Sequence, residues 1–307
     1  MSIEYPDSDI AHVLRLAFGR AVPAIPIPVA PGQSEYGMAF ALHGPRVPGR
    51  VLLLRYSPQH QTRAFRAFTV MQALHDRHFP APDIYYLGWS YYMRYVLLLV
   101  EYIEGRSVGD RPHAFFARIG PHFAETLAQL HGLVWDPFPN LAVTPLPYAF
   151  HELLTLVRRL ETWQLQEIVE WLLGQLRQIT ELPHTVIHGD YSLQNVLAEH
   201  TRVVAVQGWE QAVIADPRFD VGYTSAMLGA YGVALSDQFL EAYSAVTGPV
   251  PDCAFWEVFG ALRLLARVAR TLSTLRPPQR DRFLAQVGPH WQGLLEFVAS
   301  RSGLDLR

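Results

Sequence analysis

One short stretch constrains this chain more than any other, the residues from Val186 to Asn195. The apolar pair Val186-Ile187 leads into His188-Gly189-Asp190, and Asn195 follows five residues after the aspartate. This order predicts a buried strand that ends in a tight loop, because β-branched residues favour strands whereas glycine and aspartate favour turns. We therefore expect a carboxylate and an amide on one loop.

The spacing of these polar groups fits a particular chemistry. Phosphoryl transfer from ATP uses a carboxylate that orients the attacking hydroxyl and accepts its proton, and an amide oxygen that holds Mg2+ on the phosphates. Protein kinases carry both groups in H-R-D-x-x-x-x-N, and His188, Asp190 and Asn195 repeat that spacing. The alternative is an ordinary turn in which Asn195 caps a helix. The rest of the chain favours the kinase-type loop.

Composition limits the partners and ligands of the chain. Half of the 307 residues are hydrophobic and 17% are charged, which indicates a folded protein with a large core. The net charge of -3 predicts no nucleic-acid surface, and the longest apolar run, Tyr95 to Val100, is too short for a membrane span. All 25 cationic side chains are arginine, so a phosphate clamp must use arginine or backbone amides.

Cysteine content and the N-terminus bear on location. The single cysteine, Cys253, excludes an internal disulfide framework and fits a reducing compartment. The first residues lack the basic segment and apolar stretch of a signal peptide. We expect a cytoplasmic protein that makes no use of a membrane.

The N-terminal third predicts a small sheet with helices. Apolar spacing indicates a first helix over 10–18, and the alternating prolines of 25–29 fit only a sheet edge or an extended connection. A second helix is expected over 61–78, where prolines at 80 and 82 stop it. Strands are expected at 38–42, 50–56, 84–89 and 95–103.

Two features of this part suggest phosphate contacts. The turn 31–37 is rich in small residues, and in a nucleotide-binding lobe such a turn lies over the phosphates, although Gly32 and Gly37 as ordinary turn residues explain it equally well. Arg55, at the end of its strand, is a candidate phosphate ligand or else a solvated charge. The following helix contains no acid before Asp76 to pair with such a cation, as protein kinases require.

After Gly105 the apolar spacing becomes helical. His131 lies on an apolar helix face, so we interpret it as a core histidine. We place an N-terminal lobe at 1–103 and a C-terminal lobe at 104–307. The predicted fold class is α+β, a two-lobed protein kinase-like fold with a small antiparallel sheet and a larger, mainly helical lobe. Its later helices are expected at 165–179, 221–231, 235–247, 253–274 and 278–300.

The motifs together resemble the aminoglycoside phosphotransferase and choline kinase-like superfamily, which comprises small-molecule relatives of the protein kinases. The most specific part is the loop from His188 to Asn195. The resemblance covers nearly the whole chain, and its supporting features are the turn near Gly32, the strand ending at Arg55, the stretch from Val100 to Gly105, Leu127 to His131, and Asp216-Pro217 with Asp220.

The resemblance implies ATP in a cleft, Mg2+, and transfer of a phosphoryl group to a hydroxyl of a small molecule. By position, Asp190 would be the catalytic base and Asn195 a magnesium ligand, while His188 would orient the loop. Asp216 and Asp220 would brace it. The remaining implied contacts are with the nucleotide: Gly32, Ser34 and Arg55 at the phosphates, and the backbone of Glu101 and Ile103 at the adenine edge.

One departure from the family pattern concerns the metal. The family has an aspartate directly before an aromatic residue at the end of the strand after Asn195, and here that position is Gly208, followed by Trp209 and Glu210. Mg2+ at phosphates normally takes one or two carboxylates. In an extended segment Gly208 and Glu210 point to the same face, so Glu210 is a hypothetical replacement ligand, or else a solvated or capping acid.

Two functions therefore stay open. The first is an active ATP-dependent phosphotransferase, supported by Asp190 and Asn195. The second is a catalytically impaired pseudokinase that binds a nucleotide or a partner, supported by Gly208 and the missing helix acid. A polycationic aminoglycoside should prefer an acidic cleft, for which Asp237, Glu241, Asp252 and Glu257 are candidates. A quaternary ammonium could use Tyr223, Tyr231, Tyr243 and Trp256, although helical spacing favours core packing for these aromatics.

Overall fold

The computed structural model describes residues 7–29, 37–90, 93–105, 112–134, 141–160 and 162–306. The chain forms two compact units, and each is described here by itself. Unit 1 combines Met1–Asp110, Asp136–Leu141 and Leu193–Ala212, and unit 2 combines Arg111–Trp135, Ala142–Ser192 and Val213–Arg307. The third segment of unit 1 therefore begins directly after the loop that carries Asp190.

A five-stranded antiparallel sheet forms the frame of unit 1, with the strand order β1-β2-β3-β5-β4. Pro26 lies in β1, which is an edge strand, where a missing backbone N–H costs no sheet hydrogen bond. The elements of this part are α1 (Asp7–Phe18), β1 (Ala24–Ile27), β2 (Gly37–Leu42), β3 (Arg50–Tyr56), η1 (Pro58–His60), α2 (Gln61–His75), β4 (Ile84–Ser90) and β5 (Tyr95–Glu101).

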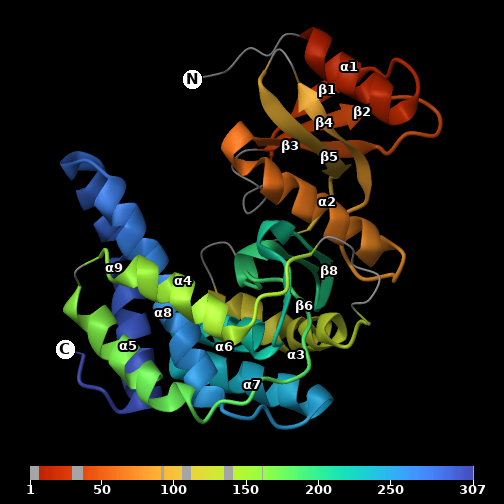
Figure 1. The fold of residues 1–307 in the computed structure, drawn as a ribbon. Coiled ribbons are helices and arrows are strands. Elements are labelled where there is room, and N and C mark those ends of the chain that lie inside the picture. The colour runs from red at the N-terminus through yellow and green to blue at the C-terminus, as the bar shows by residue number, and fades with distance from the viewer. Residues whose placement is uncertain are drawn as a thin grey trace. The chain divides into compact units, whose positions relative to one another are not determined.

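Helices α1 and α2 cover opposite faces of this sheet (Figure 1). On the α1 face a buried cluster joins Leu14 to Leu53 and Leu97. Strand β3 is apolar on both faces, since Val51, Leu52 and Leu53 are all buried. The second face of the sheet is the one that carries a cavity, described below.

The returning segment of unit 1 is short and well packed. It comprises η2 (Leu193–Asn195), the antiparallel pair β7 (Val196–Glu199) and β8 (Arg202–Val206), and η3 (Trp209–Gln211). The N–H of Val206 donates to the carbonyl of Pro80 at 2.7 Å. The ring of Trp209 is buried and meets Phe79 edge to face, with 5.8 Å between the ring centroids. These contacts fix Asn195 and Glu210 within unit 1.

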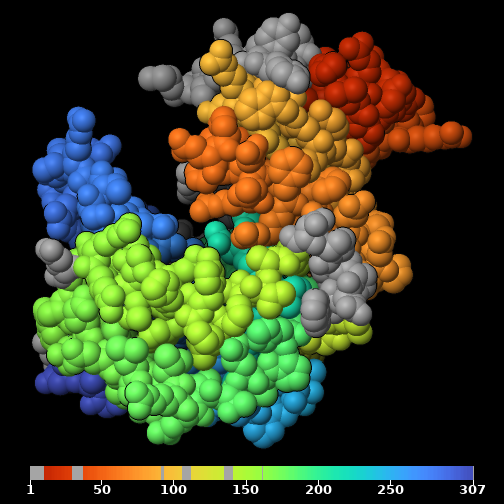
Figure 2. Space-filling model, viewed as in Figure 1, coloured from red at the N-terminus to blue at the C-terminus, as the bar shows by residue number. Residues whose placement is uncertain are grey.

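Unit 2 is mainly helical. Its strands β6 and β9 form an antiparallel two-stranded ladder, and the loop that carries Asp190 follows β6. In the space-filling view, α4 and α5 cover one side of unit 2 (Figure 2). Its elements are α3 (Pro112–His131), α4 (Leu146–Val157), α5 (Trp163–Leu176), β6 (Thr185–Ile187), β9 (Val213–Ala215), α6 (Arg218–Gly229), α7 (Val233–Thr247), α8 (Cys253–Thr274) and α9 (Pro277–Ser302).

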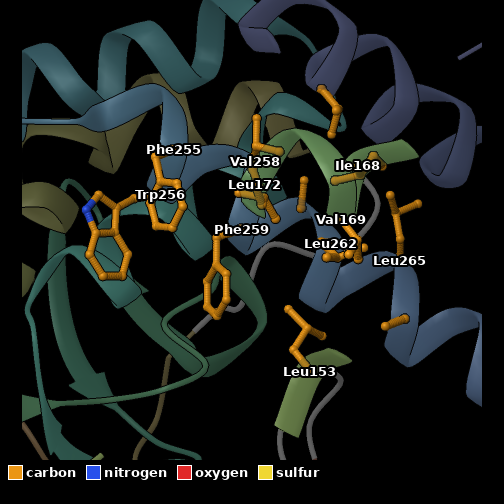
Figure 3. Packing of buried hydrophobic residues seen from close by; sticks show 14 of the residues in the cluster. Leu153, Ile168, Val169, Leu172, Phe255, Trp256, Val258, Phe259, Leu262 and Leu265 are labelled. Atoms are coloured by element: carbon orange, nitrogen blue, oxygen red, sulfur yellow. The ribbon is translucent and has the colours of Figure 1, made fainter. Parts of the chain in front are cut away.

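The core of unit 2 gathers around α8 (Figure 3), where Phe259 and Leu262 pack with Leu153 of α4 and Leu172 of α5. Helix α8 crosses α6 at very short range. A Cβ atom on Gly222 of α6 would lie 2.0 Å from the carbonyl oxygen of Trp256, and one on Gly260 would lie 2.5 Å from that of Gly222. Only glycine permits this approach, which brings the following turn of α8 against α6.

The predicted fold class is confirmed, with a small antiparallel sheet and a larger helical part. The expected strands correspond to β2, β3, β4 and β5, and the five later helices to α5 through α9. Helix α4 was missed, although Pro147 near its start is a helix signal. The two units also differ from a simple division at residue 103, because 193–212 belong to unit 1.

Candidate functional site

Unit 1 contains a cavity of about 370 Å³ on the sheet face opposite α1. Its wall is apolar in the centre, and polar groups lie along the segment that returns at residue 193. Apolar surface of this kind suits a flat heterocycle such as a purine. Glu101 and Ile103, predicted at an adenine edge, are among the lining residues. The apolar wall consists of Leu52, Leu54, Ala67, Met71, Val100 and Ile103, and the returning segment adds Asn195, Gly208 and Glu210.

Strand β3 presents Tyr56, and not Arg55, to this cavity. Tyr56 lines the cavity together with Leu54. Arg55 lies opposite Leu97 in the β3–β5 register, so it shares the α1 face of the sheet. Its guanidinium stands 5.6 Å from the ring centroid of Tyr95. The structure therefore does not bring Arg55 together with the cavity-lining residues.

Tyr56 and Glu210 form a polar pair beside the cavity. The Tyr56 hydroxyl donates to Oε1 of Glu210 at 2.6 Å. Burial first, and then the charge of Glu210, raise the pKa of Tyr56 far above its ordinary value, so the phenol stays a neutral donor. Arg66 of α2 donates to the backbone carbonyl of Glu210 at 3.0 Å. One oxygen of the only cavity carboxylate on the returning segment is thus already engaged.

Gly208 fits its place because it lacks a side chain. Its φ is +83°, which is a left-handed backbone conformation. A Cβ atom there would lie 2.7 Å from Oδ1 of Asn195. The N–H of Gln207 donates to the carbonyl of Asn195 at 2.8 Å, which holds the two segments together. The amide of Asn195 therefore occupies the space that a longer side chain at position 208 would need.

These groups do not fit the magnesium site that the resemblance implies. Within the described part of the chain, no group of three or more histidine, cysteine, aspartate or glutamate residues could hold a metal ion. Beside Asn195 there is glycine where a carboxylate is expected, and Glu210 is engaged by Tyr56. Mg2+ at phosphates usually has a carboxylate ligand free to bind it.

In unit 2, Asp220 binds the backbone of the predicted loop. This buried carboxylate accepts hydrogen bonds from the N–H of His188 at 2.6 Å and of Gly189 at 2.8 Å. Nε2 of His131 lies 3.3 Å from it. Burial alone would raise the pKa of Asp220, but the hydrogen bond from His131 and the charges of His131 and His188 outweigh burial and lower that pKa. His131, interpreted as a core histidine, is a buried partner of this loop support.

A second buried aspartate secures the start of α6. Asp216 accepts hydrogen bonds from the N–H of Leu182 at 2.8 Å and from the N–H of Arg218 at 2.9 Å. The buried guanidinium of Arg218 also lies 2.7 Å from Asp216 and 3.0 Å from Asp252. Removing Arg218 would leave the buried carboxylate of Asp216 without its counterion.

Side chains of α6 and α8 contact the carboxylate of Asp190. The hydroxyl of Tyr223 donates to Oδ1, and Nη1 of Arg267 lies 3.3 Å from Oδ2. Arg267 also donates to the Tyr223 hydroxyl at 2.5 Å, and Arg263 donates to the carbonyl of Gly189 at 3.1 Å. The N–H of Asp190 donates to Nδ1 of His188 at 3.2 Å. A carboxylate oriented in this way can accept a proton from a hydroxyl once one of its oxygens is free.

A model described as the phosphotransferase enzyme family matches residues 28–256, which is well over half of the chain. The chain belongs to this family. Its members transfer phosphoryl groups, and the loop geometry in unit 2 agrees with that chemistry. No curated protein matches the chain.

Solved structures share the fold of this phosphotransferase-family chain. A thermostable mutant of aminoglycoside phosphotransferase APH(4)-Ia with AMP-PNP and hygromycin B has 14% identity and a TM-score of 0.64, with 95% of this chain and 99% of that one covered. Spectinomycin phosphotransferase APH(9)-Ia with ADP and spectinomycin has 11% identity and a TM-score of 0.64, with 98% and 99% covered. The GDP complex of aminoglycoside 2'-phosphotransferase-IIIa has 15% identity and a TM-score of 0.62, with 97% and 99% covered.

The remaining expectations can be placed briefly. Gly32 and Ser34 lie outside the described residues. No described helix combines the length and apolarity needed to cross a membrane. Tyr243 and Trp256, considered for an ammonium cage, are buried, which agrees with core packing. Sequence reasoning missed the roles of Arg263 and Arg267, although their spacing of four residues on one helix puts them on a common face.

Proposed function

We propose that this family member transfers the γ-phosphoryl group of ATP to a hydroxyl of a small molecule. The observation that carries the proposal is the support of Asp190 in unit 2. Asp220 holds the loop before it by two buried backbone hydrogen bonds, while Tyr223 and Arg267 orient its carboxylate. Buried charge is costly unless it is paired and hydrogen-bonded, and arrangements of this kind are concentrated at functional sites.

We assign the nucleotide to unit 1. Its apolar cavity suits the base, with the backbone of Glu101 and Ile103 at the adenine edge. Gly32, Ser34 and the amide of Asn195 would face the phosphates. The similar structures support the use of a nucleotide, since their complexes contain AMP-PNP, ADP or GDP.

In the proposed reaction Asp190 is the general base. The acceptor hydroxyl gives its proton to the Asp190 carboxylate while its oxygen forms a bond to the γ-phosphorus. The bond from that phosphorus to the bridging oxygen breaks, and the electron pair leaves with ADP. Asp190 then returns the proton to solvent. Because Tyr223 and Arg267 occupy both carboxylate oxygens at rest, an acceptor must displace one of them.

A second candidate function is nucleotide binding without turnover. The contact between Gly208 and the amide of Asn195, together with the Tyr56–Glu210 hydrogen bond, favours it. These residues do not fit the expected Mg2+ site, so we assign no step to a metal. Charge stabilisation supplies most of the catalysis in phosphoryl transfer, and its loss would slow the reaction by orders of magnitude.

The test has two parts. Calorimetric titration of ATP, with and without Mg2+, measures whether unit 1 binds the nucleotide and whether the metal contributes. Release of ADP is then followed with a panel of hydroxyl acceptors, using wild type and Asp190→Asn. Acceptor-dependent release that falls at least a hundredfold in Asp190→Asn supports the transferase. Equal residual rates in both proteins, with ATP still bound, support the second candidate.

A further inference from the structure

Two arginines of α8 face the loop that carries Asp190. Arg263 reaches the carbonyl of Gly189 at 3.1 Å, and Arg267 lies 3.3 Å from Oδ2 of Asp190. Both guanidiniums stack near the ring of Tyr223, at 5.2 Å and 5.8 Å from its centroid. They come from successive turns of one helix, so both charges stand beside the same carboxylate.

This placement follows from the close crossing of α6 and α8. Gly222 and Gly260 allow the two backbones to touch, as shown above. Tyr223 follows Gly222 directly, while Arg263 and Arg267 lie one and two turns after Gly260. The shape of the crossing therefore fixes the two cations beside Tyr223 and leaves little freedom for α8 to retreat.

The charges at this place do not balance. Other buried or half-buried arginines of unit 2 are matched by acids, since Arg218 pairs with Asp216 and Asp252, and Arg301 pairs with Asp237 and Glu257. Within the described residues, Asp190 is the one carboxylate that pairs with Arg267, and Arg263 contacts a carbonyl instead. Two cations thus face a single anion.

Tyr223 does not supply the missing negative charge. Burial, and then the charge of Asp190, raise the pKa of its phenol well above the ordinary value, so the group is neutral. The surplus positive charge lies partly in solvent, because 52% of the Arg267 side chain is exposed. An exposed guanidinium with two donors in one plane is a ready partner for a carboxylate or a phosphate.

We propose that the acceptor is a hydroxyl compound carrying an anionic oxygen group, a carboxylate or a phosphate, which Arg263 and Arg267 bind. This proposal rests on the proposed transferase function. Binding of the anion draws Arg267 away from Oδ2 of Asp190 and frees that oxygen for the acceptor hydroxyl. Binding of the acceptor thus makes the Asp190 carboxylate able to accept the proton of that acceptor's hydroxyl. A polycationic acceptor would meet two like charges and would leave the Asp190–Arg267 pair closed.

Binding is tested first, without turnover. Glycerate, glycerol 3-phosphate, glycerol and kanamycin are titrated calorimetrically into wild type, Arg263→Gln, Arg267→Gln and Arg177→Gln. Arg177 is an exposed arginine at the end of α5, so its variant controls for overall charge. One or both anions should bind at least tenfold more tightly than glycerol, and Arg263→Gln and Arg267→Gln should each remove about tenfold or more of that preference. Arg177→Gln should keep it.

The glycerate and glycerol 3-phosphate arms distinguish a carboxylate from a phosphate. Anions that bind no better than glycerol, or kanamycin that binds more tightly than both anions, would overturn the proposal. An unchanged preference in both Arg263→Gln and Arg267→Gln would overturn it as well, because the anion would then bind elsewhere.

Turnover separates this proposal from the transferase function. With the same four acceptors, ADP release should favour an anionic acceptor, and Arg267→Gln should reduce its kcat/KM ratio to glycerol by about tenfold. Release with kanamycin alone overturns the acceptor class but leaves the transferase intact. Release with none of them, equal in Asp190→Asn, counts against the transferase, while the binding preference still decides the charge of the ligand.

Discussion

The polar groups of the candidate site are more completely hydrogen-bonded in unit 2 than at the polar end of the cavity in unit 1. In unit 2 the loop with Asp190 is supported by a buried aspartate that binds the backbone of His188 and Gly189, and by a tyrosine and an arginine on the Asp190 carboxylate. In unit 1 the corresponding polar end of the cavity has lost its expected carboxylate at Gly208 and has used Glu210 to bind Tyr56.

This difference separates the proposed base from the proposed phosphate site. The backbone of the loop in unit 2 is held by Asp220, which is buried together with His131, so loss of that carboxylate would destabilise the fold itself. The polar end of the cavity in unit 1 rests on the close contact of Gly208 with Asn195 and on the hydrogen bond of Tyr56 to Glu210. On the proposed roles, this chain keeps the support of Asp190 and lacks the expected carboxylate at Gly208.

The largest effect is expected when the support of the loop is removed. Asp220→Ala would leave two buried N–H groups and His131 without their acceptor, and should lower the free energy of unfolding by about 3–5 kcal/mol. Urea unfolding followed by tryptophan fluorescence measures it. Asp281→Asn, at an exposed aspartate of α9, should stay within about 0.5 kcal/mol of wild type. A loss in Asp220→Ala as small as in this control would remove the contrast between the units.

Much of this contrast was accessible from sequence. Spacing alone singled out Asp190 and Asn195 as candidates, and the resemblance to the family placed Gly208 where a carboxylate is expected. The sequence could not predict on which face of the sheet Arg55 lies. Because β3 is apolar on both faces, its residues show no alternation of polar and apolar side chains. The α1 cluster and the β5 register decide the face.

The sequence also could not predict which residues surround Asp190. Arg263 and Arg267 follow Asp190 by more than seventy residues, and only the close crossing at Gly222 and Gly260 joins them. Neither glycine has a local signal of that role, since both lie inside helices with ordinary backbone angles. The contact between Gly208 and the amide of Asn195 likewise depends on how two segments pack, and neither segment predicts it from its own sequence.

The next prediction concerns unit 1. Gly208→Ala forces a side chain into a left-handed conformation and against the Asn195 amide, and should destabilise the protein by about 1–3 kcal/mol. Gly19→Ala is the matched control, because its φ is +70° but nothing lies within 4 Å of the added carbon. Urea unfolding should show a larger loss for Gly208→Ala, and the excess measures the contact with Asn195. Equal losses would mean that backbone strain alone explains both.

Gly208→Asp extends this test to the metal. It carries the same backbone cost but adds a carboxylate beside the Asn195 amide, so ATP binding should become at least tenfold tighter in the presence of Mg2+ than in its absence. Calorimetry of ATP with and without Mg2+ measures this ratio, with Gly208→Ala as the control for strain. A ratio no greater than that of Gly208→Ala would show that this end of the cavity differs by more than one residue.

A smaller effect is expected from the Tyr56–Glu210 hydrogen bond. Tyr56→Phe removes a 2.6 Å donor to a half-buried carboxylate and should cost about 1–2 kcal/mol of unfolding free energy. Tyr148→Phe removes the same kind of bond, 3.0 Å long, to Glu152 on an exposed helix face, and should change it by less than about 0.5 kcal/mol. If the two variants lose equal stability in urea, the pair in unit 1 is no more than a surface contact.

The smallest expected effect is a difference in how the two regions respond to acid. The pKa of Asp220 is lowered in the fold from its ordinary 3.8, so its ionised form is bound more tightly in the folded state than in the unfolded chain. Its contribution is fully present above about pH 4 and is lost as the pH falls through the lowered pKa. Protonation removes the charge that attracts the N–H groups of the loop. The contact of Gln207 with the Asn195 carbonyl has no titrating acceptor and should not respond.

Hydrogen exchange at individual amides can resolve this difference. After correction for intrinsic rates, protection of the Gly189 amide should fall as the pH drops below about 4, and protection of the Gln207 amide should stay level. Asp220→Asn, which carries no titrating carboxyl, should remove the pH dependence at Gly189 and leave Gln207 as in wild type. Parallel loss at both amides would instead mean that acid opens the protein as a whole, and the loop of unit 2 would then have no electrostatic support of its own.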